Sequence, residues 1–212
     1  GSSSFNDRRA VDWVQRELIG KVTEAWVFCG KSWGDLKPLP DHQDPVPDGL
    51  NWDGWLGVGE KRPFIEKYYH PKNWRRRQDF GTGTLGDMGC HIFNSMYRGL
   101  ALTAPKRVRS KTGVPNQHNW TNNERVEYDF PATPYTGGDL KVFWVSGSQR
   151  PPKELTALIP KGIKYRFGCL LKGEKGVLLL RHGNTPILLP AEKYAGVTSK
   201  KLEAIGHHDA FI

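Results

Sequence analysis

Hydrophobic residues recur every three or four positions in two stretches, which is the spacing of one face of an α-helix. In the first stretch, residues 6–19, Val11 and Val14 share a face with Leu18, and Gly20 follows as a stop. The second stretch covers residues 84–102. Its apolar positions are Leu85, Met88, Ile92, Met96 and Leu100. Both stretches predict helices that bury one stripe of side chains.

Elsewhere the pattern is typical of β-strands, which are short runs rich in β-branched and aromatic residues between turn residues. One such run, residues 21–31, follows the first helix. After the second helix, the predicted strands cover residues 106–112, 124–130, 140–146, 165–172, 176–181 and 186–189. We expect tight connections at residues 137–139 and 173–176, where glycines are concentrated.

Strands that follow one another after helices, without strict alternation, indicate an α+β domain. We expect an open, largely antiparallel β-sheet with helices packed on one face. Residues 141–145 form an alternating row that can line the uncovered face, and such faces commonly pair subunits. The chain is therefore expected to form homo-oligomers through this open sheet face.

Residues 32–83 form a long loop, dense in Pro, Gly, Trp, Asp and His, with little periodicity. Loops of this length in a compact domain are usually functional or disordered, and the many aromatic residues argue against disorder. We expect the loop to fold over another group.

Aromatic and polar residues within this loop suit a small polar ligand, because Trp and Tyr rings stack on sugars while Asn, Arg and His bind hydroxyls and carboxylates. The candidate ligand-binding residues are Trp52, Tyr69, His70, Asn73, Trp74 and Arg75. For Trp52 and Trp55 an alternative stays open, since both equally fit anchors packed onto the core.

Asp87 and His91 are the candidate catalytic residues. They lie four positions apart on the second predicted helix, so their side chains share a face. A carboxylate there can orient an imidazole and favour its protonated form, which is the minimum needed to move a proton at neutral pH. The alternative is an ordinary structural pair on a helix surface.

The length of 212 residues supports a single α+β domain, expected over residues 6–212, after a short vector-derived tail at residues 1–5. The cysteines, Cys29, Cys90 and Cys169, are far apart and odd in number, so we expect buried thiols and no disulfide framework. No apolar run approaches the roughly 18 residues of a membrane span, and no membrane partner is expected.

The net charge of +9 and the basic run at residues 72–77 invite a nucleic-acid interpretation. The other basic residues are interspersed with acids and no nucleic-acid-binding motif is present, so we expect no nucleic-acid partner. A metal site is also disfavoured. Cys90 points about 100° away from His91 on a helix, and the adjacent His207 and His208 diverge.

Three segments, taken in order, resemble one known family. They are residues 50–57 (LNWDGWLG), 69–75 (YHPKNWR) and 79–91 (DFGTGTLGDMGCH). Together they resemble the C-terminal domain of the Gfo/Idh/MocA oxidoreductases, the glucose-fructose oxidoreductase and inositol dehydrogenase family, and especially its bacterial, sugar-directed branch. The similarity covers most of the chain.

The resemblance implies an enzyme of two parts, a Rossmann domain that holds NAD(P) and an α/β domain that binds substrate and mediates assembly. By similarity, His91 is the acid/base for the hydroxyl proton while hydride passes between a sugar or polyol carbon and the nicotinamide. Asp87 positions the substrate or the imidazole, and Asn73, Trp74 and Arg75 contact the sugar. The implied role is the substrate-binding and assembly domain of an NAD(P)-dependent sugar or polyol oxidoreductase.

The sequence departs from the complete family pattern, because no strand runs into a G-x-G-x-x-G turn and no Glu-Lys-Pro element occurs. The pairs Gly57/Gly59 and Gly81/Gly83 lie in the loop. We therefore expect the Rossmann domain to be absent, no NAD(P) bound to this chain alone, and no hydride transfer without a cofactor domain.

Two other functions stay open. Related folds use NAD to oxidise a sugar carbon transiently so that a glycosidic bond breaks by elimination, and such a glycosidase would use the same residues. A non-catalytic domain would only bind a sugar or pair subunits, with Asp87 and His91 buried against other protein groups. The sequence leaves the location unknown, between the bacterial cytoplasm and, if an export signal precedes the chain, the periplasm.

Overall fold

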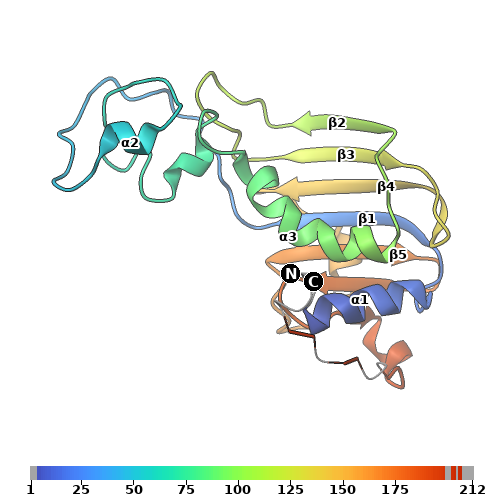
Figure 1. The fold of residues 1–212 in the computed structure, drawn as a ribbon. Coiled ribbons are helices and arrows are strands. Elements are labelled where there is room, and N and C mark those ends of the chain that lie inside the picture. Colours follow the sequence, from blue (N-terminus) through green and yellow to red (C-terminus); the bar gives the residue numbers. More distant parts are fainter. Residues whose placement is uncertain (1–3, 199–201, 204, 207–212) are drawn as a thin grey trace.

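The computed structural model describes residues 4–198, 202–203 and 205–206, so His207, His208 and residues 1–3 of the predicted tail lie outside the described residues. The described part contains a seven-stranded β-sheet in the order β2-β3-β4-β1-β5-β6-β7 (Figure 1). The strands are β1 (Val22–Cys29), β2 (Arg107–Thr112), β3 (Arg125–Phe130), β4 (Thr136–Ser146), β5 (Phe167–Gly173), β6 (Val177–Arg181) and β7 (Ile187–Leu189). The helical elements are α1 (Phe5–Gln15), α2 (Trp52–Leu56), η1 (Asn73–Arg76), α3 (Gly83–Gly99), α4 (Lys153–Thr156) and η2 (Ala191–Tyr194).

The sheet is mixed but mostly antiparallel. Strand β1 pairs with β4 in parallel, and the other neighbouring strands are antiparallel. Between β1 and β4 the chain forms α2, η1, α3, β2 and β3. This long connection allows β4 to lie beside β1 and to run parallel to it. The predicted α+β class with an open, largely antiparallel sheet is confirmed.

Helix α3 buries its predicted stripe against the sheet. Met88, Ile92 and Met96 are buried in the main core, and the two helices α1 and α3 lie side by side on one face (Figure 1). Where they meet, a Cβ on Gly99 would lie 3.2 Å from the Cβ of Val14. The close contact between the helices therefore depends on the absence of a side chain at Gly99.

Helix α1 ends at Gln15, four residues before the predicted limit. Glu17 has a φ of 51°, and a non-glycine residue in the left-handed region interrupts the helical path. The helix buries Trp13 and Val14, while Val11 is only half-buried. The predicted helix was right in type and wrong in its C-terminal limit.

The expected turn at residues 137–139 is wrong, because these residues belong to β4. The register between β1 and β4 shifts here, from Val22 opposite Thr136 to Glu24 opposite Lys141. Gly138 has a φ of 140°, a conformation that glycine adopts without strain. The glycines therefore form an irregularity inside the strand, whereas the expected turn at residues 173–176 is present, with the Gly173 N–H donating to the Gly176 carbonyl at 2.8 Å.

The sheet face opposite α1 and α3 is partly covered. In the row at residues 141–145, Lys141 is exposed, Phe143 is half-buried and Val145 is buried. Leu155 of α4 belongs to the hydrophobic cluster on this face, which includes Trp26 and Val145. The uncovered part of the face lies over β2, β3 and the adjoining part of β4, where charged side chains replace apolar ones.

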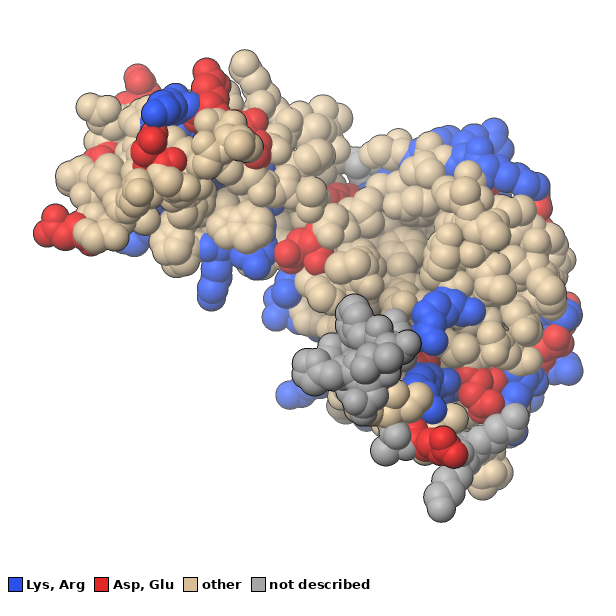
Figure 2. All heavy atoms as spheres, in the orientation of Figure 1, with Lys and Arg blue, Asp and Glu red and all other residues tan. Residues whose placement is uncertain are grey.

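Residues 32–83 project from the end of the sheet as a lobe with its own small core (Figure 1). That core consists of Ile65, Tyr68 and Tyr69, with Trp52, Trp55 and Phe80 packed against it. Between Lys37 and Lys61 the sequence contains acidic residues but no lysine or arginine, and acidic side chains are prominent on the lobe in Figure 2. The positive net charge is therefore carried by the rest of the molecule.

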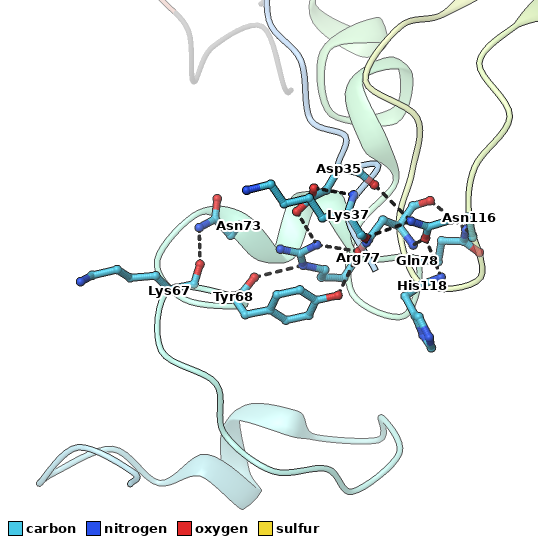
Figure 3. Close-up of polar contacts among 10 residues, drawn as sticks. Asp35, Lys37, Lys67, Tyr68, Asn73, Arg77, Gln78, Asn116 and His118 are labelled. Atoms are coloured by element: carbon cyan, nitrogen blue, oxygen red, sulfur yellow. Dashed lines mark hydrogen bonds and ion pairs between the residues drawn. The ribbon is translucent and has the colours of Figure 1, made fainter. Parts of the chain in front are cut away.

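Arg77 joins the lobe to the sheet body (Figure 3). This buried arginine donates from Nε to the Tyr68 carbonyl at 3.0 Å and from Nη1 to Asp35 Oδ2 at 3.1 Å and Asn119 Oδ1 at 2.6 Å. Its guanidinium also lies 3.4 Å from the centre of the Tyr68 ring. One side chain thus links three segments that are distant in the sequence, which explains why a long loop has a defined shape.

Candidate functional site

An ion pair between Arg75 and Asp87 lies where the lobe meets the start of α3. The Arg75 Nε donates to Asp87 Oδ1 at 3.0 Å, and both side chains are about three-quarters buried, with 29% and 23% exposed. The chain at residue 81 can lie close to the Arg75 backbone only because residue 81 is a glycine. A Cβ there would lie 2.5 Å from the Cα of Arg75. The backbone between η1 and α3 is therefore packed directly against the arginine.

The Arg75 guanidinium lies over the rings of two tryptophans. Its central carbon lies 4.4 Å from the Trp74 ring and 5.4 Å from the Trp33 ring. The Trp33 backbone N–H donates to Thr84 Oγ1 at 2.8 Å, which ties the chain after β1 to the first turn of α3. Cation–π contacts and the ion pair together fix the guanidinium in one place.

His91 lies one helical turn beyond Asp87, and its imidazole is exposed. The Asp87 carboxylate bonds Arg75, and within the described residues no hydrogen bond joins it to His91. Of the two roles expected for Asp87, orientation of the imidazole therefore does not occur in this structure. The centroid of the His182 ring lies 5.5 Å from that of the His91 ring.

These residues surround an open pocket of about 440 Å³. Its lining consists of Lys31, Trp33, Lys72, Arg75, Asp87, Met88 and His91. The structure therefore brings together three of the predicted site residues, Arg75, Asp87 and His91. Trp74 adjoins them through its contact with Arg75.

Trp52 and Tyr69 lie elsewhere, in the core of the lobe. The Trp52 indole Nε1 donates to the Arg62 carbonyl at 2.8 Å, and its ring stacks on Trp55 at 4.9 Å. Tyr69 is 2% exposed, and burial raises the pKa of its phenol, partly offset by Arg62. The anchor interpretation left open for Trp52 and Trp55 is the one that the structure shows.

Asn73 and His70 also do not line the pocket. The Asn73 amide nitrogen donates to the Lys67 carbonyl, which closes the turn before η1. His70 is exposed beside that turn. Both residues shape the segment that carries Trp74 and Arg75.

Sequence reasoning missed Lys31, Trp33 and Lys72. Lys31 and Trp33 follow β1 and are more than fifty positions before His91, so only the folded chain brings them to the start of α3. The available signal was their position, since they are the first residues after a strand that runs beside the helix. Lys72 had been assigned to the basic run without a role of its own.

A sequence profile described as "Oxidoreductase family, C-terminal alpha/beta domain", of the Gfo/Idh/MocA group, matches residues 10–133. The chain belongs to this family. The matched region runs from α1 to the end of β3 and includes all the pocket residues. A search among curated proteins gave no significant match.

The Gfo/Idh/MocA family is generally NAD(P)-dependent, and the described residues of this C-terminal domain contain no glycine-rich turn between a strand and a helix. Strand β1 leads into the lobe and not into a glycine-rich turn before a helix. Gly83 is the first residue of α3 and no strand comes directly before it, while Gly81 is packed on the Arg75 backbone.

Neither a metal cluster nor a membrane span is found in the part of the chain that the structure describes. No group of three or more His, Cys, Asp or Glu side chains there could hold a metal ion. None of the described helices is long and apolar enough to cross a membrane.

Proposed function

We propose that this domain binds the sugar or polyol substrate of a Gfo/Idh/MocA oxidoreductase, with His91 as the acid/base for the reacting hydroxyl. The observation that carries the proposal is the exposed imidazole of His91 in the wall of a pocket that the fixed Arg75–Asp87 pair also lines. An exposed histidine in a ligand-sized pocket can both reach a hydroxyl and exchange its proton with solvent.

Each neighbouring residue has a separate role in this proposal. Arg75 offers its Nη donors to substrate oxygens, since the bond to Asp87 uses Nε. Asp87 keeps the guanidinium in position and does not itself transfer a proton. The Trp33 ring, beside Arg75, provides an apolar surface for the C–H face of a sugar. In the complete enzyme, the bound cofactor supplies the hydride acceptor or donor.

The proposal is tested by locating the ligand on the 212-residue chain. Indole N–H resonances are recorded by NMR while D-glucitol, myo-inositol or glucose is added. We expect the Trp33 resonance to shift, while the Trp52 resonance, whose N–H is bonded inside the lobe, stays in place. If ligands shift Trp52 and not Trp33, or shift neither indole, the pocket is not the substrate site.

We also propose that the uncovered part of the sheet pairs two copies of the chain. Here Asp129 of β3 accepts bonds from Arg107 and Arg109 of β2 at 2.9 and 3.2 Å, and Arg125 lies 5.7 Å from the Phe143 ring. In a dimer with two-fold symmetry, both copies contribute the same patch, and the two patches run in opposite directions. Basic side chains of one copy can then face acidic side chains of the other. Sedimentation velocity is expected to show a dimer that Arg125→Glu dissociates, and a monomer at all concentrations would contradict this role.

A further inference from the structure

The lining of this pocket contains more cationic side chains than carboxylates. Three cationic side chains, those of Lys31, Lys72 and Arg75, line it together with one carboxylate, that of Asp87. Asp87 is occupied by Arg75 at 3.0 Å. Within the described residues, neither Lys31 nor Lys72 forms a salt bridge, so two ammonium groups face the pocket region without a counter-ion.

Lys31 is held beside the pocket and does not extend freely into solvent. Its Nζ lies 5.8 Å from the Trp33 ring, 5.6 Å from the Phe167 ring and 3.3 Å from Met88 Sδ. A thioether is a weak acceptor, so the ammonium keeps its strong donor capacity. Because Lys31 is half-buried, its charge is screened less than that of an exposed lysine.

Trp33 provides a second, independent sign of a missing acceptor. Its indole Nε1 is buried and has no hydrogen-bond partner in the described part of the chain. A buried donor without a partner costs free energy, and such groups call for a specific explanation. Trp33 lines the same pocket as Lys31, Lys72 and Arg75. The unsatisfied donor therefore belongs to a residue of the pocket wall that carries the cationic side chains.

We infer that the substrate of this pocket, which Trp33 also lines, carries an oxyanion, either a carboxylate or a phosphate, bound by Lys31 and Lys72. An ionised carboxylate or phosphate only accepts hydrogen bonds, which matches a set of donors, whereas a hydroxyl also brings a proton that needs an acceptor. This inference rests on the proposed function, because it places the anion in the same pocket. It narrows the substrate class from neutral sugars to acidic sugar derivatives.

The test is calorimetric titration of the 212-residue chain with matched ligands at low and high salt. D-gluconate carries a carboxylate, D-glucose 6-phosphate carries a phosphate, and D-glucitol is the neutral reference. We expect at least one acidic ligand to bind about tenfold more tightly than glucitol at low salt, with the difference shrinking as salt screens the charges. A preference for gluconate identifies a carboxylate, and one for glucose 6-phosphate identifies a phosphate.

Charge-neutralising variants locate the effect. Lys31→Gln and Lys72→Gln are each expected to reduce the acidic preference several-fold, while Lys61→Gln, an exposed lobe lysine, retains the preference. Equal binding of acidic and neutral ligands, or a preference that survives in the Lys31/Lys72 double variant, would overturn the inference. If glucitol alone shifts the Trp33 indole, the proposed function stands and the oxyanion inference fails; if no ligand shifts it, the proposed function fails first.

Discussion

Asp87 bonds Arg75 at 3.0 Å, although His91 lies one turn away on the same helix. The pair joins a residue of the lobe to a residue of α3, so it sets the spacing between two parts of the pocket wall. The imidazole of His91 is left exposed, with its proton-exchanging nitrogens available to a ligand or to solvent. In the proposed function, the Asp87 carboxylate holds the Arg75 guanidinium in place while His91 transfers the proton.

The Arg75–Asp87 pair is expected to show a coupling free energy of about 1 kcal/mol, because both side chains are partly buried and the bond is short. The measurement is a double-mutant cycle with Arg75→Met and Asp87→Asn, using urea unfolding of all four proteins. Additive losses in the double variant would show that the two residues do not stabilise each other.

Gly81→Ala is expected to destabilise the protein by about 1–3 kcal/mol, because the new methyl would overlap the Arg75 backbone. Gly196→Ala is the matched control, since nothing lies within 4 Å of a Cβ there. Urea unfolding compares the two variants, and the NMR shift of Trp33 on ligand addition reports whether the pocket survives. Similar stability for both would mean that Gly81 is not tightly packed.

Ile92→Ala is expected to lower the free energy of unfolding by about 3 kcal/mol, since Ile92 is 5% exposed in the main core. Cys90, two positions earlier, is exposed, and Cys90→Ala is expected to change stability by less than about 0.5 kcal/mol. Thermal or urea unfolding of the two variants measures this contrast. A loss at Cys90 as large as that at Ile92 would place the wrong face of α3 against the sheet.

Arg77→Met is expected to cost about 3–5 kcal/mol, because it leaves the partly buried Asp35 carboxylate without its arginine and removes one of the two donors to the buried Asn119 Oδ1. The lobe should then be cleaved more readily in limited proteolysis. Lys61→Met, at an exposed lobe position, serves as the control and is expected to leave both measurements near those of the unaltered protein. Unchanged cleavage of the lobe in Arg77→Met would remove Arg77 as the link to the sheet.

Burial raises the pKa of Tyr128 to about 12, and Glu124 adds to the effect. An unfolded tyrosine loses its proton near pH ~10, so the stability from this group is complete below that pH and is lost as the pH rises to about 12. Tyr128→Phe keeps the ring and removes the titration. Unfolding free energies measured across this pH range should fall more steeply for the unaltered protein, and identical slopes would contradict the assignment.

The sheet and the long helix were predictable because hydrophobic periodicity, residue type and turn residues all indicate the same elements. The stripe through Met88, Ile92 and Met96 has only one helical interpretation, and the strand runs are bounded by turn residues. The failures have local causes. Glu17 ends α1 early through its positive φ, and Gly138 sits in a strand irregularity that resembles a turn in the sequence.

The site was predictable only in part. Asp87 and His91 share a helix face, so their proximity follows from spacing alone, and both line the pocket. Lys31 and Trp33 reach the pocket through the pairing of distant segments, which spacing does not reveal. Trp52 has the composition of a sugar-binding residue, but its neighbours Trp55 and Tyr69 bury it in the lobe. Burial, and not residue type, decides between anchor and ligand contact.

The most direct test of the central claim is turnover by the enzyme that combines this domain with its cofactor domain, measured for His91→Asn and for His42→Asn. Loss of a general acid/base is expected to lower kcat by about 10²–10⁴-fold in His91→Asn, with unchanged stability. His42, an exposed lobe residue outside the pocket, should be dispensable. Full turnover in His91→Asn would contradict the account.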